Sequence, residues 1–194
     1  MSEHRSAQVA NLVNRLGRAS HALQFASGLN PAQWDALRYL ARANRYSRTP
    51  TALAEFLGTT KGTASQTLRA LETKGFVSRS PRGRDRRVVD LEITGAGREL
   101  LEKDPIRRVE AAASTLSADA SAAIASGLEA LMARLQADCG SKPFGICATC
   151  GHFQPDGVAF RCGLNGDALD EADTGTLCVN FINEPKAPSG STTT

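Results

Sequence analysis

The stretch A-L-A-E-F-L-G-T-T-K-G-T-A-S-Q-T-L-R-A-L-E, residues 52–72, decides the fold. It has the pattern of two short helices that meet at a tight turn. Ala54 is small enough to let the helices cross closely, and Gly58 suits the turn between them. Ala64 and Leu68 share one face of the second helix and seat it against the first. The pattern therefore predicts a helix-turn-helix.

The positions of the second helix that do not face the first are polar. Such side chains can contact base edges and phosphates in a major groove, whereas in an ordinary all-helical domain they would only be solvated. The candidate DNA-binding residues of this helix are Thr60, Lys61, Thr63, Ser65, Gln66 and Arg69.

A β-hairpin rich in arginine is expected next. F-V-S-R is short and β-prone, V-V-D-L-E-I alternates between apolar and polar residues, and S-P-R-G-R-D-R-R forms the loop between them. Residues 60–90 hold eight Lys/Arg against three Asp/Glu. This charge favours a wing that contacts phosphates or enters the minor groove. Its candidate contact residues are Arg82, Arg84, Asp85, Arg86 and Arg87, with Arg79 just before them.

Helix start signals and apolar stripes complete the first part of the chain. Caps are expected at Asn30 (before Pro31, with Gln33 completing a capping box), Thr49, Thr60, Thr94 and Ser117, and a break is expected near Asp104 because of Pro105. The stripes Leu12/Leu16/Leu23 and Ile124/Leu128/Leu131/Leu135 exceed what a small winged domain can bury. Unless they pack on each other within one chain, they predict a homodimer.

Together, residues 6–137 resemble the MarR family of winged helix-turn-helix regulators. The similar stretches are L-N-P-A-Q-W-D-A-L, T-L-R-A-L-E-T-K-G-F-V and D-R-R-V-V-D-L-E-I-T-G-A-G. The resemblance implies a homodimer joined by its first and last helices, a palindromic double-stranded DNA operator and repression of transcription. It implies that Asp85 orients an arginine and Arg87 reaches the minor groove. It assigns base reading to Thr63, Ser65 and Gln66.

The composition narrows the remaining classes. The N-terminus has no apolar signal region, and no run approaches the roughly 18 apolar residues of a membrane span, so a cytoplasmic protein is expected. The chain has three histidines and no hydrolytic constellation, so it is not expected to be an enzyme. In a reducing cytosol, five cysteines suit metal binding or redox chemistry better than a disulfide framework.

Four of the cysteines follow the last predicted helix in the pattern C-x2-C-x11-C-x15-C. They are Cys147, Cys150, Cys162 and Cys178. Four thiolates can complete a tetrahedral metal site, and a metal would supply folding energy to a tail with few apolar residues. Cys139 is a spare thiol that could be redox-reactive or an alternative ligand, and His152 could replace one cysteine.

Three interpretations of the four cysteines stay open. They could hold a structural zinc ion, although the second pair lacks the C-x-x-C of a zinc ribbon. They could hold an iron–sulfur cluster, which the pattern C-x-x-C-x-x-F favours slightly because it is similar to small cluster-bearing modules. Cys147 and Cys150 could instead form a dithiol/disulfide switch without metal.

The sequence thus predicts a mainly α protein with a small β-wing. A winged helix-turn-helix dimer (1–138) is followed by a cysteine-rich metal-binding module (139–183) and a disordered tail (184–194). The leading interpretation is that the protein is a sequence-specific repressor. Its metal centre would sense redox or metal state, and a change in the centre would shift the last helix. In one alternative the zinc is purely structural and a small aromatic effector controls DNA binding. In another, the module serves redox or protein docking and DNA binding is secondary.

Overall fold

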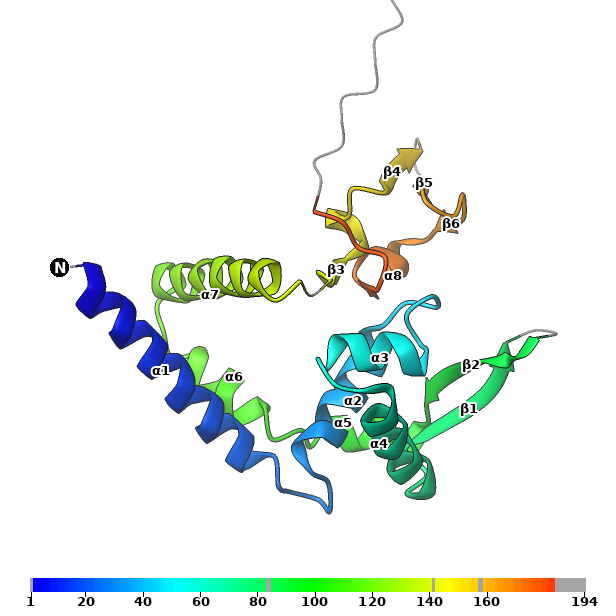
Figure 1. Cartoon of the computed structure of the whole chain (residues 1–194), viewed down its shortest axis with the longest axis horizontal. Helices are drawn as coiled ribbons and strands as arrows, with labels where there is room; N and C mark the ends of the chain where they lie inside the picture. The colour runs from blue at the N-terminus through cyan, green and yellow to red at the C-terminus, as the bar shows by residue number, and fades with distance from the viewer. Residues whose placement is uncertain (1, 83–84, 141, 157–158, 184–194) are drawn as a thin grey trace, which may run out of the picture.

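A computed structural model describes residues 2–82, 85–140, 142–156 and 159–183 of the chain of 194 residues. Three parts can be followed in Figure 1. The first is a winged-helix core, and the second is an arm of helices from the start of the chain and from residues 107–138. The third is a cysteine-rich tail that lies against the core. The predicted disordered tail, 184–194, lies outside the described residues.

The core contains a helix-turn-helix followed by a two-stranded wing. Its elements are α2 (Pro31–Arg42), α3 (Pro50–Phe56), α4 (Lys61–Thr73), β1 (Val77–Arg82), β2 (Asp85–Ile93) and α5 (Gly95–Leu101). The strands pair antiparallel, from Val77 opposite Ile93 to Arg82 opposite Asp85, with an irregularity between Pro81 and Arg82. The predicted helix-turn-helix and wing are both present.

The predicted caps explain where the helices begin. Asn30 accepts a hydrogen bond from the Gln33 amide at 3.0 Å, and the Gln33 side chain accepts one from the Asn30 amide at 3.3 Å, so the capping box is confirmed. Thr49, Thr60 and Thr94 cap α3, α4 and α5 through their hydroxyls.

The hydrophobic core lies where α2, α3, α4 and the wing meet. Trp34, Leu37 and Leu40 of α2 are fully buried, as are Leu53 of α3, Leu68 and Leu71 of α4, and Leu91 of β2. The alternation predicted for β2 is confirmed, because Leu91 and Ile93 are buried on the same face. This packing fixes α4 relative to the wing.

The arm consists of α1 (Ser2–Leu23), α6 (Arg107–Ala113) and α7 (Ala118–Asp138). The helix predicted after Thr94 ends at Leu101, and α6 begins after Pro105, as the proline predicted. None of the helices in the described residues is both long enough and apolar enough to span a membrane.

The tail is built from short strands. Its elements are β3 (Gly145–Ile146), a 3-10 turn η1 (Cys147–Thr149), β4 (Phe153–Asp156), β5 (Ala159–Cys162), β6 (Ala168–Leu169), α8 (Glu171–Thr174) and β7 (Leu177–Cys178). β3 pairs with β7, and β4, β5 and β6 form a small sheet. Phe144, Ile146, Leu177 and Val179 also pack on the core cluster, so the tail shares the hydrophobic core of the winged domain.

Candidate DNA-binding surface and four-cysteine site

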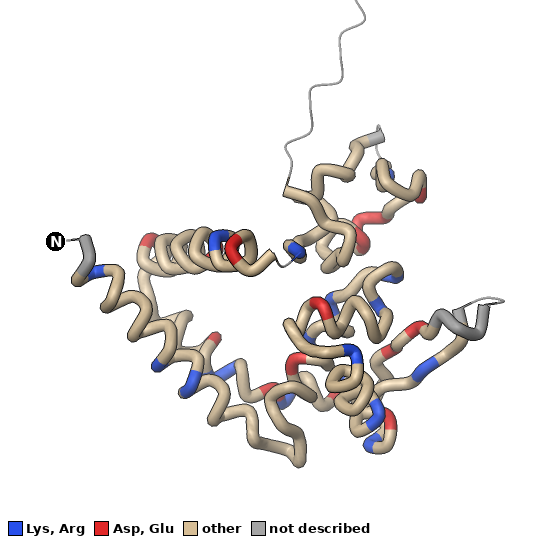
Figure 2. Tube along the Cα trace, viewed as in Figure 1, with Lys and Arg blue, Asp and Glu red and all other residues tan. Residues whose placement is uncertain are grey.

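The polar face predicted on the second helix of the helix-turn-helix lies on α4. Ser65 is half-buried, and the other five candidates, Thr60, Lys61, Thr63, Gln66 and Arg69, are exposed. Thr60 also caps the helix, since its Oγ1 accepts from the Thr63 amide at 3.1 Å and lies 2.9 Å from the Thr63 hydroxyl. α4 therefore presents a row of polar side chains. The helix lies beside the wing (Figure 1), and its Lys and Arg positions are blue in Figure 2.

The wing carries the other candidate residues. The backbones of Arg82, Asp85, Arg86 and Arg87 lie in β1 and β2. Their side chains, and Arg84 as a whole, lie outside what the structure describes. Their proposed DNA contacts therefore stay predictions.

Arg79 has a different role from the one its sequence position suggests. Its guanidinium forms an ion pair with Glu72 of α4 at 3.1 Å and donates to the Ser65 carbonyl oxygen at 3.4 Å. The side chain is only 24% exposed. Arg79 thus joins the wing to α4 rather than pointing toward a DNA backbone.

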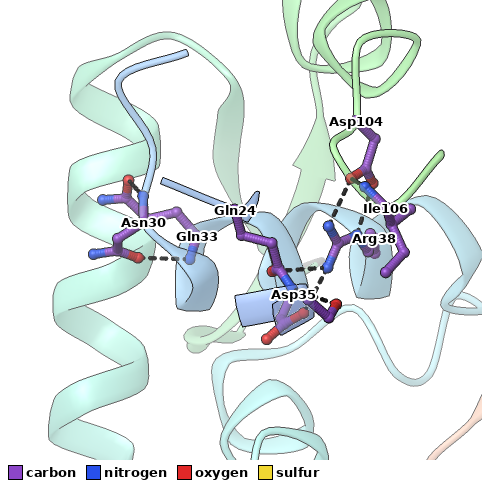
Figure 3. A network of polar contacts seen from close by, with 8 residues as sticks. Gln24, Asn30, Gln33, Asp35, Arg38, Asp104 and Ile106 are labelled. Carbon is purple, nitrogen blue, oxygen red and sulfur yellow. Dashed lines mark hydrogen bonds and ion pairs between the residues drawn. The ribbon is translucent and has the colours of Figure 1, made fainter. Parts of the chain in front are cut away.

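A polar network connects the core to the arm (Figure 3). Arg38 of α2 forms a bidentate pair with Asp104, with N–O distances of 2.7 and 2.6 Å, and donates to Gln24 at 3.1 Å. Asp104 also accepts from the Ile106 amide at 2.9 Å. The bond to Asp104 raises the pKa of Arg38, which therefore remains charged. One arginine thus ties α2 to the end of α1 and to the start of α6.

The four cysteines of the tail line one small cavity. Cys147 and Cys150 bracket the turn η1, Cys162 ends β5 and Cys178 lies in β7. The cavity has a volume of about 10 Å³ and is also lined by His152, Phe153, Leu164, Asn165 and Asn180. Three of the cysteines are buried and Cys162 is half-buried, whereas Cys139 is exposed at the end of α7. The four cysteines of the spacing pattern therefore meet at one cavity, and Cys139 lies outside this cavity.

Four thiols line this cavity, but their sulfur atoms are not in ligand geometry. No group of three or more Cys, His, Asp or Glu side chains in the described residues is already placed to hold a metal. A metal would have to draw the sulfurs inward from the cavity wall. One sulfur already accepts a hydrogen bond, because the Asn180 amide donates to Cys178 Sγ at 3.4 Å. Burial, and then the neighbouring cysteines, raise the pKa of Cys147 to about 11.

The tail docks on the loop between α2 and α3, residues 43–49, which we call the α2–α3 loop. The Asn44 amide donates to the Leu177 carbonyl at 2.9 Å, and the Val179 amide donates to Ser47 Oγ at 2.8 Å. Tyr46 hydrogen-bonds to Asp167, and Arg45 lies 3.8 Å from the same carboxylate. Further along, Lys142 pairs with Glu55 of α3 at 3.3 Å.

Aromatic packing reinforces this docking. Phe144 lies edge-on to Tyr39 and Phe56, with ring centroids 6.3 and 5.3 Å apart. None of these contacts follows from the sequence of the loop. Its residues A-N-R-Y-S-R show no periodic spacing of apolar side chains, and only their pairing with a distant part of the chain reveals the docking site.

These features define a winged helix-turn-helix protein with a polar, exposed second helix and an added cysteine-rich tail. Residues 27–88 match the model of the MarR family. This match confirms the prediction that the chain is not an enzyme. A search of curated protein sequences finds no match.

Solved structures show the same fold at low sequence identity. The transcriptional regulator BldR from Sulfolobus solfataricus is 22% identical, with a TM-score of 0.56, over 69% of this chain and 99% of that one. FabT from Streptococcus pneumoniae in complex with DNA is 23% identical, with a TM-score of 0.55, over 70% of this chain and 98% of that one. Apo MarR from E. coli is 23% identical, with a TM-score of 0.51, over 64% and 95%.

Proposed function

We propose that the protein is a sequence-specific DNA-binding transcriptional repressor that acts as a homodimer. The observation that carries this proposal is the α4 surface, where Thr60, Lys61, Thr63, Gln66 and Arg69 are exposed, next to a wing whose sequence is basic. Lys and Arg would bind phosphates, and Gln66 and the hydroxyl groups would contact base edges in the major groove. The similarity to FabT, which was solved with DNA, supports the same use of the fold.

The arm supports the homodimer. In the single chain α1 and α7 leave large apolar side chains exposed, among them Leu12 and Leu16 at 54%, Ile124 at 50% and Leu135 at 49%. Single exposed leucines are common on the surface of a monomer, whereas a row of them on neighbouring helices is typical of an interface. A two-fold dimer through these helices would present two α4 helices to half-sites roughly 34 Å apart.

Repression follows from how such a dimer would sit on DNA. A protein that occupies two adjacent major grooves blocks access of the transcription machinery to that site.

Selection from a random pool of duplex DNA tests this function. The full chain should enrich a palindrome whose half-site centres lie about 10 base pairs apart. Gln66→Ala should relax the base preference within each half-site, and Ala130→Glu, on the exposed far face of α7, should leave the enriched sequence unchanged. Enrichment of no sequence by the full chain would refute a sequence-specific regulator.

A further inference from the structure

We propose that Cys147, Cys150, Cys162 and Cys178 bind one zinc-type metal ion, and that this ion holds the α2–α3 loop in the position that supports the wing. The second half of this proposal rests on the proposed function, because it concerns how the wing is placed for DNA. The first half does not. Neither half involves Cys139, which is exposed and lies outside the cavity.

The donor set and the room favour a single ion over a cluster. Four thiols around one cavity are the donor set of structural zinc sites. The cavity volume of about 10 Å³ corresponds to roughly one water-sized sphere. A four-iron cluster is much larger than a single metal ion, so a cavity of this size favours the ion. We therefore propose a single ion rather than the cluster that the cysteine pattern slightly favours.

The tail also has only a small hydrophobic core of its own. In its described part, the buried apolar residues are Cys147, Cys150, Leu169, Leu177, Cys178 and Phe181, of which half are cysteines. Phe181 packs so closely on Gly145 that a Cβ there would lie 2.4 Å from the ring. Since so little apolar surface is buried within the tail itself, coordination would add folding free energy to what its docking on the core supplies. Each thiol that binds the ion gives up its proton to solvent, and the Asn180 amide already donates to one sulfur.

The path from the ion to the wing is short and direct. The residues on either side of Cys178 both bond to the α2–α3 loop: the Leu177 carbonyl accepts from Asn44, and the Val179 amide donates to Ser47. The next residue of the loop then holds the wing, because the Arg48 carbonyl accepts from the Leu91 amide of β2 at 2.8 Å.

Ser47 is the central residue of this path. It is fully buried. Its hydroxyl donates to Asn44 Oδ1 at 2.7 Å, and its carbonyl accepts from the Tyr39 hydroxyl at 2.8 Å. Because these groups of Asn44 and Ser47 are engaged in hydrogen bonds, the loop cannot shift without breaking several of them. Metal bound at Cys178 therefore restrains the loop, and through it the base of the wing.

The first experiment measures metal in the full chain purified without oxygen. We expect one zinc per chain, no colour, and replacement by Co²⁺ with the visible absorption of a tetrahedral thiolate site. Cys162→Ser should lower the metal content, and the matched variant Cys139→Ser should keep it. Iron with sulfide in a coloured sample, or a Cys147–Cys150 disulfide without metal, would overturn the single-ion site.

The second experiment avoids variants that fail to fold. Chelation of the wild-type protein should weaken binding to its selected palindrome by about tenfold, and added zinc should restore it, because about one buried hydrogen-bond link is lost. Ser47→Ala should keep the zinc, bind DNA more weakly and respond less to chelation. Equal affinity with and without metal would refute the restraint on the wing. Failure to select any DNA would instead refute the proposed function and leave the metal measurement standing.

Discussion

A single glycine shows how closely the wing and the following helix are packed. Gly97, in the first turn of α5, lies against the base of the wing, and a Cβ there would be 2.3 Å from the Phe76 carbonyl oxygen and 2.8 Å from Ile93 Cγ1. The backbone carbonyl cannot rotate away as a flexible side chain would. Gly95, two residues earlier, has nothing within 4 Å of the same position.

Gly97→Ala should therefore lower the free energy of unfolding by about 1–3 kcal/mol, the usual cost of overpacking a core. Gly95→Ala is the matched control and should be neutral or stabilising by up to about 1 kcal/mol. Urea denaturation of both variants measures the difference. Equal stability of the two variants would contradict the close contact.

At the scale of elements, the relation between α4 and the wing depends on Arg79. Because Arg79 pairs with Glu72 of α4, it should position the wing, whereas exposed Arg69 should bind a phosphate directly. Arg69→Ala should weaken DNA binding and reduce the slope of log affinity against log salt by about 0.9. Arg79→Ala should weaken binding with little change in the slope. Binding measured between low and moderate salt separates the two roles, and equal slope changes would show that Arg79 also contacts phosphate.

The elements themselves were largely predictable, because local signals fixed them. Thr49, Thr60 and Thr94 each mark a helix start through one hydroxyl. The alternation of apolar and polar residues in β2 agrees with the burial of Leu91 and Ile93. The contact of the Arg79 side chain with α4 could not be predicted, since a sequence does not tell which arginines of a basic hairpin face a neighbouring helix. The four cysteines could be grouped by their spacing, and in the structure they line one cavity.

The docking of the tail on the core joins distant parts of the chain and could not be predicted from the sequence. We expected the cysteine site to act through the last helix, which precedes it in the sequence. The contacts run instead from β7 to the α2–α3 loop, more than a hundred residues away in the chain. Hydrogen bonds of this kind join backbone groups and small polar residues, which carry no periodic pattern. These contacts do not cover α7, whose large apolar side chains are exposed.

That exposed face of α7 makes the last prediction one about assembly. Leu128 is on the apolar stripe, so Leu128→Glu should place a charge in the dimer interface and yield monomers. Ala130→Glu, on the opposite and also exposed face of the helix, should leave the dimer intact. Light scattering after gel filtration measures the mass of each variant. The monomeric variant should also lose most of its affinity for the palindrome, because it engages only one half-site at a time. If the Leu128→Glu protein remained dimeric, the dimer interface would have to lie elsewhere. If the protein were monomeric yet bound the palindrome as tightly as wild type, dimerisation would not be needed for recognition.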